Sequence, residues 1–371
     1  MNTNAVITRI RNRLGPLGWG TLLVFFAYRL GDVAAVAAKV VLGRWLPDED
    51  FGAIEPIFSV LAVMCVPITI LFQASVKSIS RLQEKAQTDE MTGLLRDLIK
   101  ITCVGSVVSV ATLFLFRRLI LLGLHLPDEL WIVTLIAGLF ALAWWNPLMM
   151  AVLQGKQRYH MVGMFVGFGP FLVLALTIMF VGMMNMGLTG SLLARVVGSA
   201  CWVGIVMALM SSSFRGRRGD YRAELIVLRG TLLPMSVFIL FQTILMHCDR
   251  LFVRQYMISD SGGYGAIVTL GQIPLWLISP MIFVLFPLVS AGHVGGRDIR
   301  YLLRQAMIFG LVIGGTCILV LFFSSCLLFR LWKQSFVPYA GYVWIYTLVM
   351  VLHALTEVIA RVELARNRYA F

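Results

Sequence analysis

The chain has 371 residues, of which 59% are hydrophobic and only 13% are charged, and its mean hydropathy is +0.87. One water-soluble core of this length could not bury so much apolar surface, so the composition excludes a soluble protein and predicts a polytopic membrane protein. The 31 basic residues exceed the 18 acidic ones by a net charge of +13, which we interpret as a signal of membrane topology, and we predict no nucleic-acid partner.

Ten apolar stretches follow one another along the chain, each with the roughly 20 residues that a helix needs to cross a bilayer. We therefore predict an all-α polytopic membrane protein with ten transmembrane helices. The stretches lie at 18–43, 53–76, 101–121, 130–153, 160–183, 187–210, 230–253, 264–289, 305–329 and 340–360.

The basic residues sort unevenly between the two sides of the membrane. If the N-terminus is cytoplasmic, 21 of them fall in cytoplasmic segments, six in outer segments and four within spans. Because basic residues are retained on the cytoplasmic side, we expect both termini there. No small-residue cleavage site follows a short apolar region, so we expect an uncleaved first span rather than a signal peptide.

A repeat links the second and the eighth span. At an offset of 213 residues, the aromatic-Gly-Ala-Ile stretch that begins at Phe51 matches the one that begins at Tyr264, and Pro67 matches Pro280. This offset spans six crossings, an even number, so both copies must enter the membrane from the same side. We therefore expect two parallel bundles related by an axis along the membrane normal, a plan found in secondary transporters.

The repeat predicts the domain organisation. If the second bundle is as long as the first, it stops after four of six helices, and we expect two helices to be missing, either by truncation or in a natural ten-helix variant. The predicted parts are a cytoplasmic basic tail (1–16), a six-helix bundle (17–210), a cytoplasmic linker (211–229) and an incomplete bundle (230–371).

The sequence lacks the motifs of several enzyme classes. All six cysteines fall inside predicted spans and none has the CxxC spacing, so we expect no disulfide framework and no metal site. There is no GxxxxGK[ST] loop, no HExxH and no GxSxG. We therefore predict a transporter rather than an enzyme, with no cofactor.

Charged residues inside the spans are candidates for function, because each costs about 2.5–3.5 kcal/mol at the bilayer centre. On the first span Arg29, Asp32 and Lys39 share an arc of roughly 80° at 100° per residue. On the seventh, Gln242 and Asp249 share a face. The other candidates are Arg250 beside them, Arg195 with Trp202 on the sixth span, and Tyr342, Tyr346, His353, Glu357 and Arg361 on the tenth.

Structural roles compete with functional ones. Asp249 and Arg250 could be anchors that snorkel to the interface. Arg29 and Asp32 at i, i+3 could neutralise each other, and for Glu357 and Arg361 at i, i+4 a structural pair is the preferred interpretation. A functional role is favoured on the first and seventh spans, which are equivalent in the repeat and both carry mixed charge.

Several segments resemble a known family. The stretches are GRWLPDEDFG (43–52), QASVKSISR (73–81), CDRLFVRQY (248–256), GGYGAI (262–267), PMIFVLFPLVS (280–290) and ARNRYAF (365–371). They are similar to the Wzx-like flippases of lipid-linked oligosaccharide and polysaccharide, a branch of the multidrug/oligosaccharidyl-lipid/polysaccharide exporter superfamily. The resemblance covers nearly the whole chain, but this sequence stops before the twelve to fourteen helices of that family.

The resemblance implies an inner-membrane protein that moves a polyprenyl-diphosphate-linked oligosaccharide, such as an O-antigen or exopolysaccharide repeat unit, to the outer leaflet by alternating access. Its partners would be that lipid, the bilayer and other polysaccharide-assembly proteins. Since cations bind phosphate oxygens, Arg29, Lys39, Arg195 and Arg250 would contact the head group. Asp32, Asp249, Gln242, His353 and Glu357 would orient them or couple transport to H⁺ or Na⁺, and Pro67, Pro280 and Pro287 would bend helices.

Two alternatives stay open at this stage. A cation-coupled multidrug exporter of the same fold would prefer an acidic, aromatic cavity, and a non-transporting scaffold of a glycan-assembly complex would bind partners without moving lipid.

Overall fold

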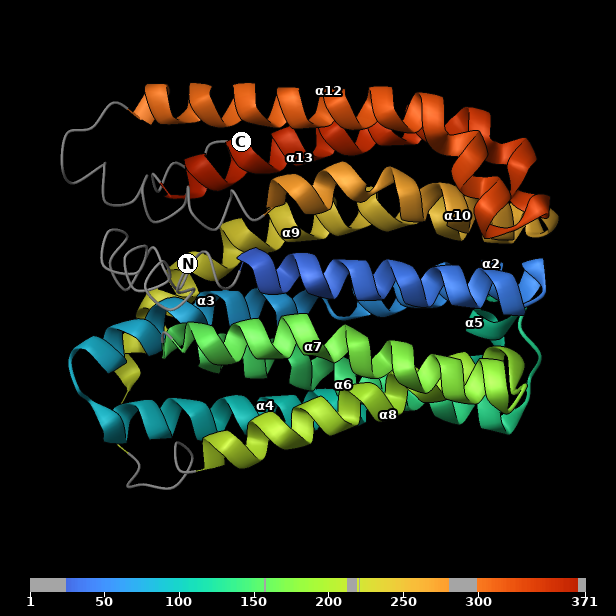
Figure 1. Cartoon of the computed structure of the whole chain (residues 1–371). Coiled ribbons are helices and arrows are strands. Elements are labelled where there is room, and N and C mark those ends of the chain that lie inside the picture. The colour runs from blue at the N-terminus through green and yellow to red at the C-terminus, as the bar shows by residue number, and fades with distance from the viewer. Residues whose placement is uncertain (1–24, 157, 212–218, 220, 280–298, 366–371) are drawn as a thin grey trace, which may run out of the picture. The chain divides into compact units, whose positions relative to one another are not determined.

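A computed structural model describes residues 25–156, 158–211, 219, 221–279 and 299–365, and every regular element in those residues is a helix (Figure 1). The contacts divide the chain into two compact units, Met1–Ser261 and Gly262–Phe371. We call them the first and the second unit and describe each by itself.

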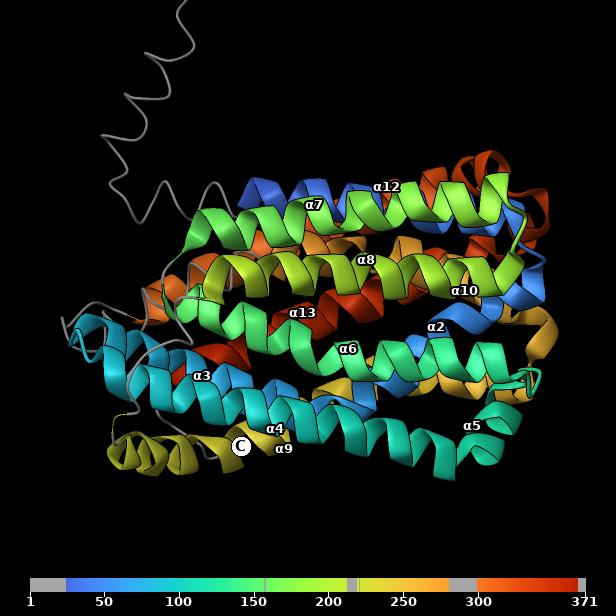
Figure 2. The same cartoon turned by 90° about the horizontal axis from the view of Figure 1, so that it is seen from below.

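The first unit consists mainly of long helices that run side by side (Figures 1 and 2). A helix over residues 25–45 comes first. The others are α2 (Asp48–Met64), α3 (Val66–Glu84), α4 (Thr88–Leu115), the short α5 (Arg117–Leu124), α6 (Leu130–Gly155), α7 (Tyr159–Thr177) with its π-helical end η1 (Ile178–Met183), α8 (Gly187–Met210), α9 (Arg222–Tyr256) and the 3₁₀ turn η3 (Ile258–Asp260).

The second unit is built around two long helices, α12 (Ile299–Trp332) and α13 (Val343–Ala365), which pack along each other (Figure 1). The 3₁₀ segment η4 (Gln334–Tyr342) joins them. α10 (Ser261–Gly271) and a helix over 273–279 precede them. Ile278, Ala354 and Val358 form the fully buried centre of this unit's core.

These helices confirm the predicted all-α polytopic membrane fold. Within the described residues, seven helices are long and apolar enough to cross a membrane, and α2 with α3 adds an eighth span that is bent by 56°. The helix over 25–45 carries three charged residues within its apolar run, Arg29, Asp32 and Lys39. The remaining predicted span, 264–289, runs partly outside the described residues.

α6 provides the core of the first unit. It packs against α3, α4 and α8, and its Leu148, Met149, Val152 and Leu153 are fully buried. Close packing on the α4 side requires Gly105, because a Cβ there would lie 2.0 Å from the ring of Trp144. α6 therefore fixes the positions of the helices around it, including α8, which carries Arg195.

The repeat in the sequence coincides with a repeat in the structure. α2 begins at Asp48 and α10 begins at Ser261, an offset of 213 residues, the same as between the two matching sequences. In each helix the Gly-Ala-Ile stretch is buried. Pro67 stands in the first turn of α3, where the bend from α2 occurs at Cys65, whereas Pro280 and Pro287 lie outside the described residues.

The predicted linker at 211–229 runs partly outside the described residues, and the limits of the predicted domains stay predictions. Because α9 packs along α2 and α3, the contacts place it in the first unit, and the boundary falls after η3. The predicted relation between two parallel bundles, and the cytoplasmic placement of both termini, stay predictions.

Candidate functional site

A buried carboxylate on α2 is the centre of the candidate site. Glu55 lies in the buried stretch from Phe51 to Ile57, is only 8% exposed, and precedes Pro56, a residue without a backbone N–H. An ionised carboxylate in an apolar helix is costly unless cations or donors compensate for its lost hydration. The positions of the neighbouring cations therefore decide what Glu55 can do.

Two cations from different helices bind the two oxygens of this carboxylate. Lys39 Nζ, from the helix over 25–45, lies 2.6 Å from Oε1. Arg250 Nη1, from α9, lies 2.9 Å from Oε2. All three side chains are at least four-fifths buried, so water screens their attraction only weakly. Glu55 thus joins α2 to the first and the seventh span.

A third cation reaches the same place from α8. The guanidinium of Arg195 lies over the ring of Phe58, with Cζ 4.3 Å from its centroid, and interacts electrostatically with Glu55. Phe58 follows Glu55 by three residues on α2, so ring and carboxylate lie on neighbouring positions of one helical face. The aromatic face provides the guanidinium with a second attractive contact.

A small polar network extends the site along α2 and α9. The Ser59 hydroxyl donates a hydrogen bond to the Glu55 carbonyl over 2.9 Å, and His247 Nδ1 lies 3.1 Å from Ser59 Oγ. His247 Nδ1 is also 3.4 Å from Arg250 Nη1. We call the whole group the Glu55 cluster: Lys39, Glu55, Ser59, Arg195, His247 and Arg250.

The cluster gathers three of the four cations that the sequence singled out. Lys39, Arg195 and Arg250 meet around Glu55, whereas Arg29 pairs with Asp32 over 2.9 Å and lies 5.7 Å from the ring of Phe25. The Arg29–Asp32 pair is the i, i+3 arrangement that the sequence allowed. Whether any of these residues binds substrate stays a prediction.

The remaining candidates are distributed over both units. Asp249 and Gln242 are half-buried on α9, close in sequence to the cluster. His353 and Glu357 lie one turn apart on α13 of the second unit, and Glu357 is buried. Among the described residues, no group of three His, Cys, Asp or Glu side chains could hold a metal ion.

Sequence reasoning missed Glu55, Ser59 and His247. Glu55 lies within the predicted second span, 53–76, only two residues from its start. The signal was available: a single acid in the apolar run FGAIEPIFSVLAV needs a buried partner.

Arg254 has a structural role at the end of α9. It is 3% exposed, and its guanidinium donates to the carbonyls of Leu124 (2.7 Å), Glu49 (2.9 Å) and His125 (3.3 Å). It also donates to the Ser261 hydroxyl over 3.0 Å. These bonds join the ends of α5 and α9 to the start of α2, and we call this region the α5 end of the first unit.

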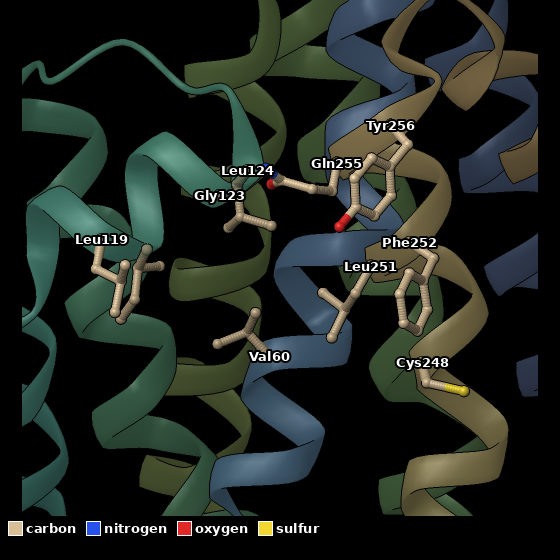
Figure 3. Close-up of a pocket in the computed structure, with 10 residues that line it drawn as sticks. Val60, Leu119, Gly123, Leu124, Cys248, Leu251, Phe252, Gln255 and Tyr256 are labelled. Carbon is tan, nitrogen blue, oxygen red and sulfur yellow. The ribbon is translucent and has the colours of Figure 1, made fainter.

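A cavity of about 440 Å³ lies near the α5 end, between α2, α5 and α9 (Figure 3). Most of its lining is apolar, as Val60, Leu119 and Leu251 show, while Gln255 extends toward Gly123 (Figure 3). On α9 it uses Cys248, Leu251, Phe252 and Gln255, a face next to the one that carries His247 and Arg250. The cavity is therefore distinct from the charged cluster.

Comparisons with known proteins identify the fold. No protein-family model and no curated protein matches the sequence. A multidrug resistance MATE family transporter of the MOP superfamily, in its inward-facing conformation, matches with a TM-score of 0.74 and 14% identity over 91% of this chain and 81% of that one.

Two further solved structures match with lower scores. A MATE transporter from Vibrio cholerae has a TM-score of 0.65 and 15% identity over 98% of this chain and 88% of its own. A MOP superfamily transporter from Pyrococcus furiosus, whose binding pocket is described as having reversed polarity and suggesting a different function, has a TM-score of 0.64 and 15% identity over 94% and 84%. The chain therefore has a MATE-like polytopic membrane fold.

Proposed function

We propose that this protein is a secondary transporter that moves an anionic, lipid-linked head group across the membrane by alternating access, with a polyprenyl-diphosphate-linked oligosaccharide as the substrate. The observation that carries the proposal is the meeting of Lys39, Arg195 and Arg250 around one carboxylate. Three cations and one acid leave positive charge in excess. Such a site favours a diphosphate, because guanidinium and ammonium groups bind phosphate oxygens strongly where water is largely excluded.

The fold is compatible with this function, since the solved neighbours are transporters of the MOP superfamily. The excess positive charge disfavours a cationic drug, because the cations of the site would repel the positive charge of the drug. In the proposed cycle Asp32 and Asp249 orient the cations or couple transport to H⁺ or Na⁺, and the oligosaccharide follows the head group.

A flipping assay in proteoliposomes tests the proposal. The purified protein is reconstituted with a fluorescent polyprenyl-diphosphate oligosaccharide, and the fraction of the label that an external quencher reaches is followed in time. We expect flipping by the native chain and its loss when Lys39→Met and Arg250→Met are combined. Arg330→Met is the control, because Arg330 is an exposed cation at the end of α12.

The outcome that contradicts the proposal is unchanged flipping by the double variant at equal protein levels. No flipping by the native chain would contradict it as well and would favour a scaffold.

A multidrug exporter is the second candidate, since the neighbours include multidrug MATE transporters and Glu55 is a buried acid. Export of a cationic dye that stops with Glu55→Gln would favour that candidate.

A further inference from the structure

Glu55 occupies the same donors that an incoming phosphate would need. Its Oε1 and Oε2 bind the Lys39 ammonium and the Arg250 guanidinium at 2.6 and 2.9 Å. A phosphate group in this place would bind the same two cations through two of its oxygens. The carboxylate and the ligand therefore compete for these cations.

The internal repeat shows that the helix itself does not require this charge. At the offset of 213, Val268 on α10 is the equivalent of Glu55 on α2, and it is fully buried. Phe252 is the equivalent of Lys39, and Ala37 is the equivalent of Arg250. The acid and its two cations thus form a set that occurs in only one of the two repeats, as expected for a specialised site.

We propose that Glu55 is the resident counter-anion of the cation site and determines its specificity. It holds Lys39 and Arg250 when the site is empty and is displaced when a ligand binds. A ligand with only one pair of weakly charged oxygens, such as acetate, gains little binding free energy by replacing the Glu55 carboxylate. A diphosphate offers more anionic oxygens than Glu55, and Arg195 over Phe58 supplies a third cation for them. The proposal rests on the proposed function and assigns a residue to its selectivity.

Displacement has a measurable consequence for Glu55→Gln. The amide keeps the shape of the side chain but leaves the cations without their buried anion, which destabilises the empty protein. An added anion can then enter without competition. The variant should bind anions more tightly than the native chain and should discriminate less between them.

The test is a thermal-shift titration of the purified full chain in nanodiscs at constant ionic strength. The probes are inorganic pyrophosphate, inorganic phosphate and acetate. We expect the native chain to respond to pyrophosphate more than to phosphate, and hardly to acetate. For Glu55→Gln we expect a lower midpoint without anion, recovery with pyrophosphate, and an affinity about tenfold higher than that of the native chain.

Two further variants make the test specific. Glu129→Gln, an exposed acid before α6, should behave as the native chain does. Glu55→Asp keeps the charge on a shorter side chain that reaches the two cations less well, so its affinity for pyrophosphate should lie between those of the native chain and Glu55→Gln. This variant also decides the matter if Glu55→Gln does not fold.

The result that overturns the inference is an affinity of Glu55→Gln or Glu55→Asp for pyrophosphate that is equal to or weaker than the native one. If the native chain flips lipid-linked glycan but this result is obtained, the proposed function stands and the role of Glu55 falls. If the native chain moves no such lipid while Glu55→Gln gains anion affinity, the counter-anion stands and the proposed function falls.

Discussion

Arg250 and Glu55 form a buried ion pair across 195 residues of sequence, with Nη1 and Oε2 2.9 Å apart. The pair connects α9 to α2 inside the first unit. Its two side chains are 5% and 10% exposed, so its disruption cannot be compensated by bulk water.

The pair predicts a strong energetic coupling. Removing one partner of a buried ion pair leaves the other charge uncompensated and typically costs about 3–5 kcal/mol. Glu55→Gln should lower the free energy of unfolding by about 3 kcal/mol in anion-free buffer. Arg250→Met should lower it by less, because Glu55 keeps its contact with Lys39. The double variant should lose less than the sum, with a coupling energy of about 1–3 kcal/mol. Unfolding in mixed micelles, followed by tryptophan fluorescence, measures all four proteins, and simple additivity would contradict the prediction.

Substitution of Arg254 should lower the stability of the protein without weakening anion binding. Arg254→Gln removes donors from three backbone carbonyls and one hydroxyl. Hydrogen bonds to charged groups contribute about 1.5–3 kcal/mol each, so we expect a cost of about 3 kcal/mol after relaxation. The thermal midpoint should fall, while the pyrophosphate affinity of the folded protein should not change.

Arg118→Gln is the matched control, because Arg118 is exposed on α5 at the same end of the unit. An equal effect of the two substitutions would show that charge, and not the buried hydrogen bonds, is responsible.

A larger residue at position 31 should disturb the packing between the first span and α7. A Cβ at Gly31 would lie 2.4 Å from the backbone oxygen of Val166, and a backbone atom cannot move aside as a flexible side chain can. Gly31→Ala should therefore destabilise the chain by about 1–3 kcal/mol through overpacking. Gly204→Ala has open space around its Cβ and should be neutral, or stabilising by up to about 1 kcal/mol. The thermal midpoints of the two variants check the contrast, which would fail if both fell alike.

We expect the bend between α2 and α3 to depend on Pro67. Its ring removes a backbone N–H in the first turn of α3, where the two helices meet at 56°. Pro67→Ala restores that donor and should allow a straighter helix pair. Pulsed electron resonance between spin labels at the exposed positions Glu49 and Gln83, in a background without native cysteines, should show a longer distance. An unchanged distance would assign the bend to packing alone.

The spans could be predicted from the sequence because each one is a continuous apolar run, and the structure confirms an all-helical membrane fold. The start of α10 could be predicted from that of α2 by the repeat. The partners of the charges could not be predicted in the same way. Lys39 and Arg250 each bind an acid on another helix, and no periodicity within one helix specifies such a contact.

The different partners of the two arginines on α9 could not be predicted from the local sequence pattern either. Arg250 and Arg254 are one turn apart and have the same side chain, but one binds a carboxylate and the other binds backbone carbonyls. The outcome depends on which segment packs against each turn of α9. Arg29–Asp32, a pair within one helix, could be anticipated from spacing.

The hold of Arg254 on α2, α5 and α9 has a mechanical consequence. Segments that bind one guanidinium have little freedom to slide past each other. The α5 end of the first unit should therefore move as a rigid body. A hinge within the first unit would then lie near Cys65, where α2 and α3 meet at an angle. A label beside Leu124 would report the rotation of the whole α5 end.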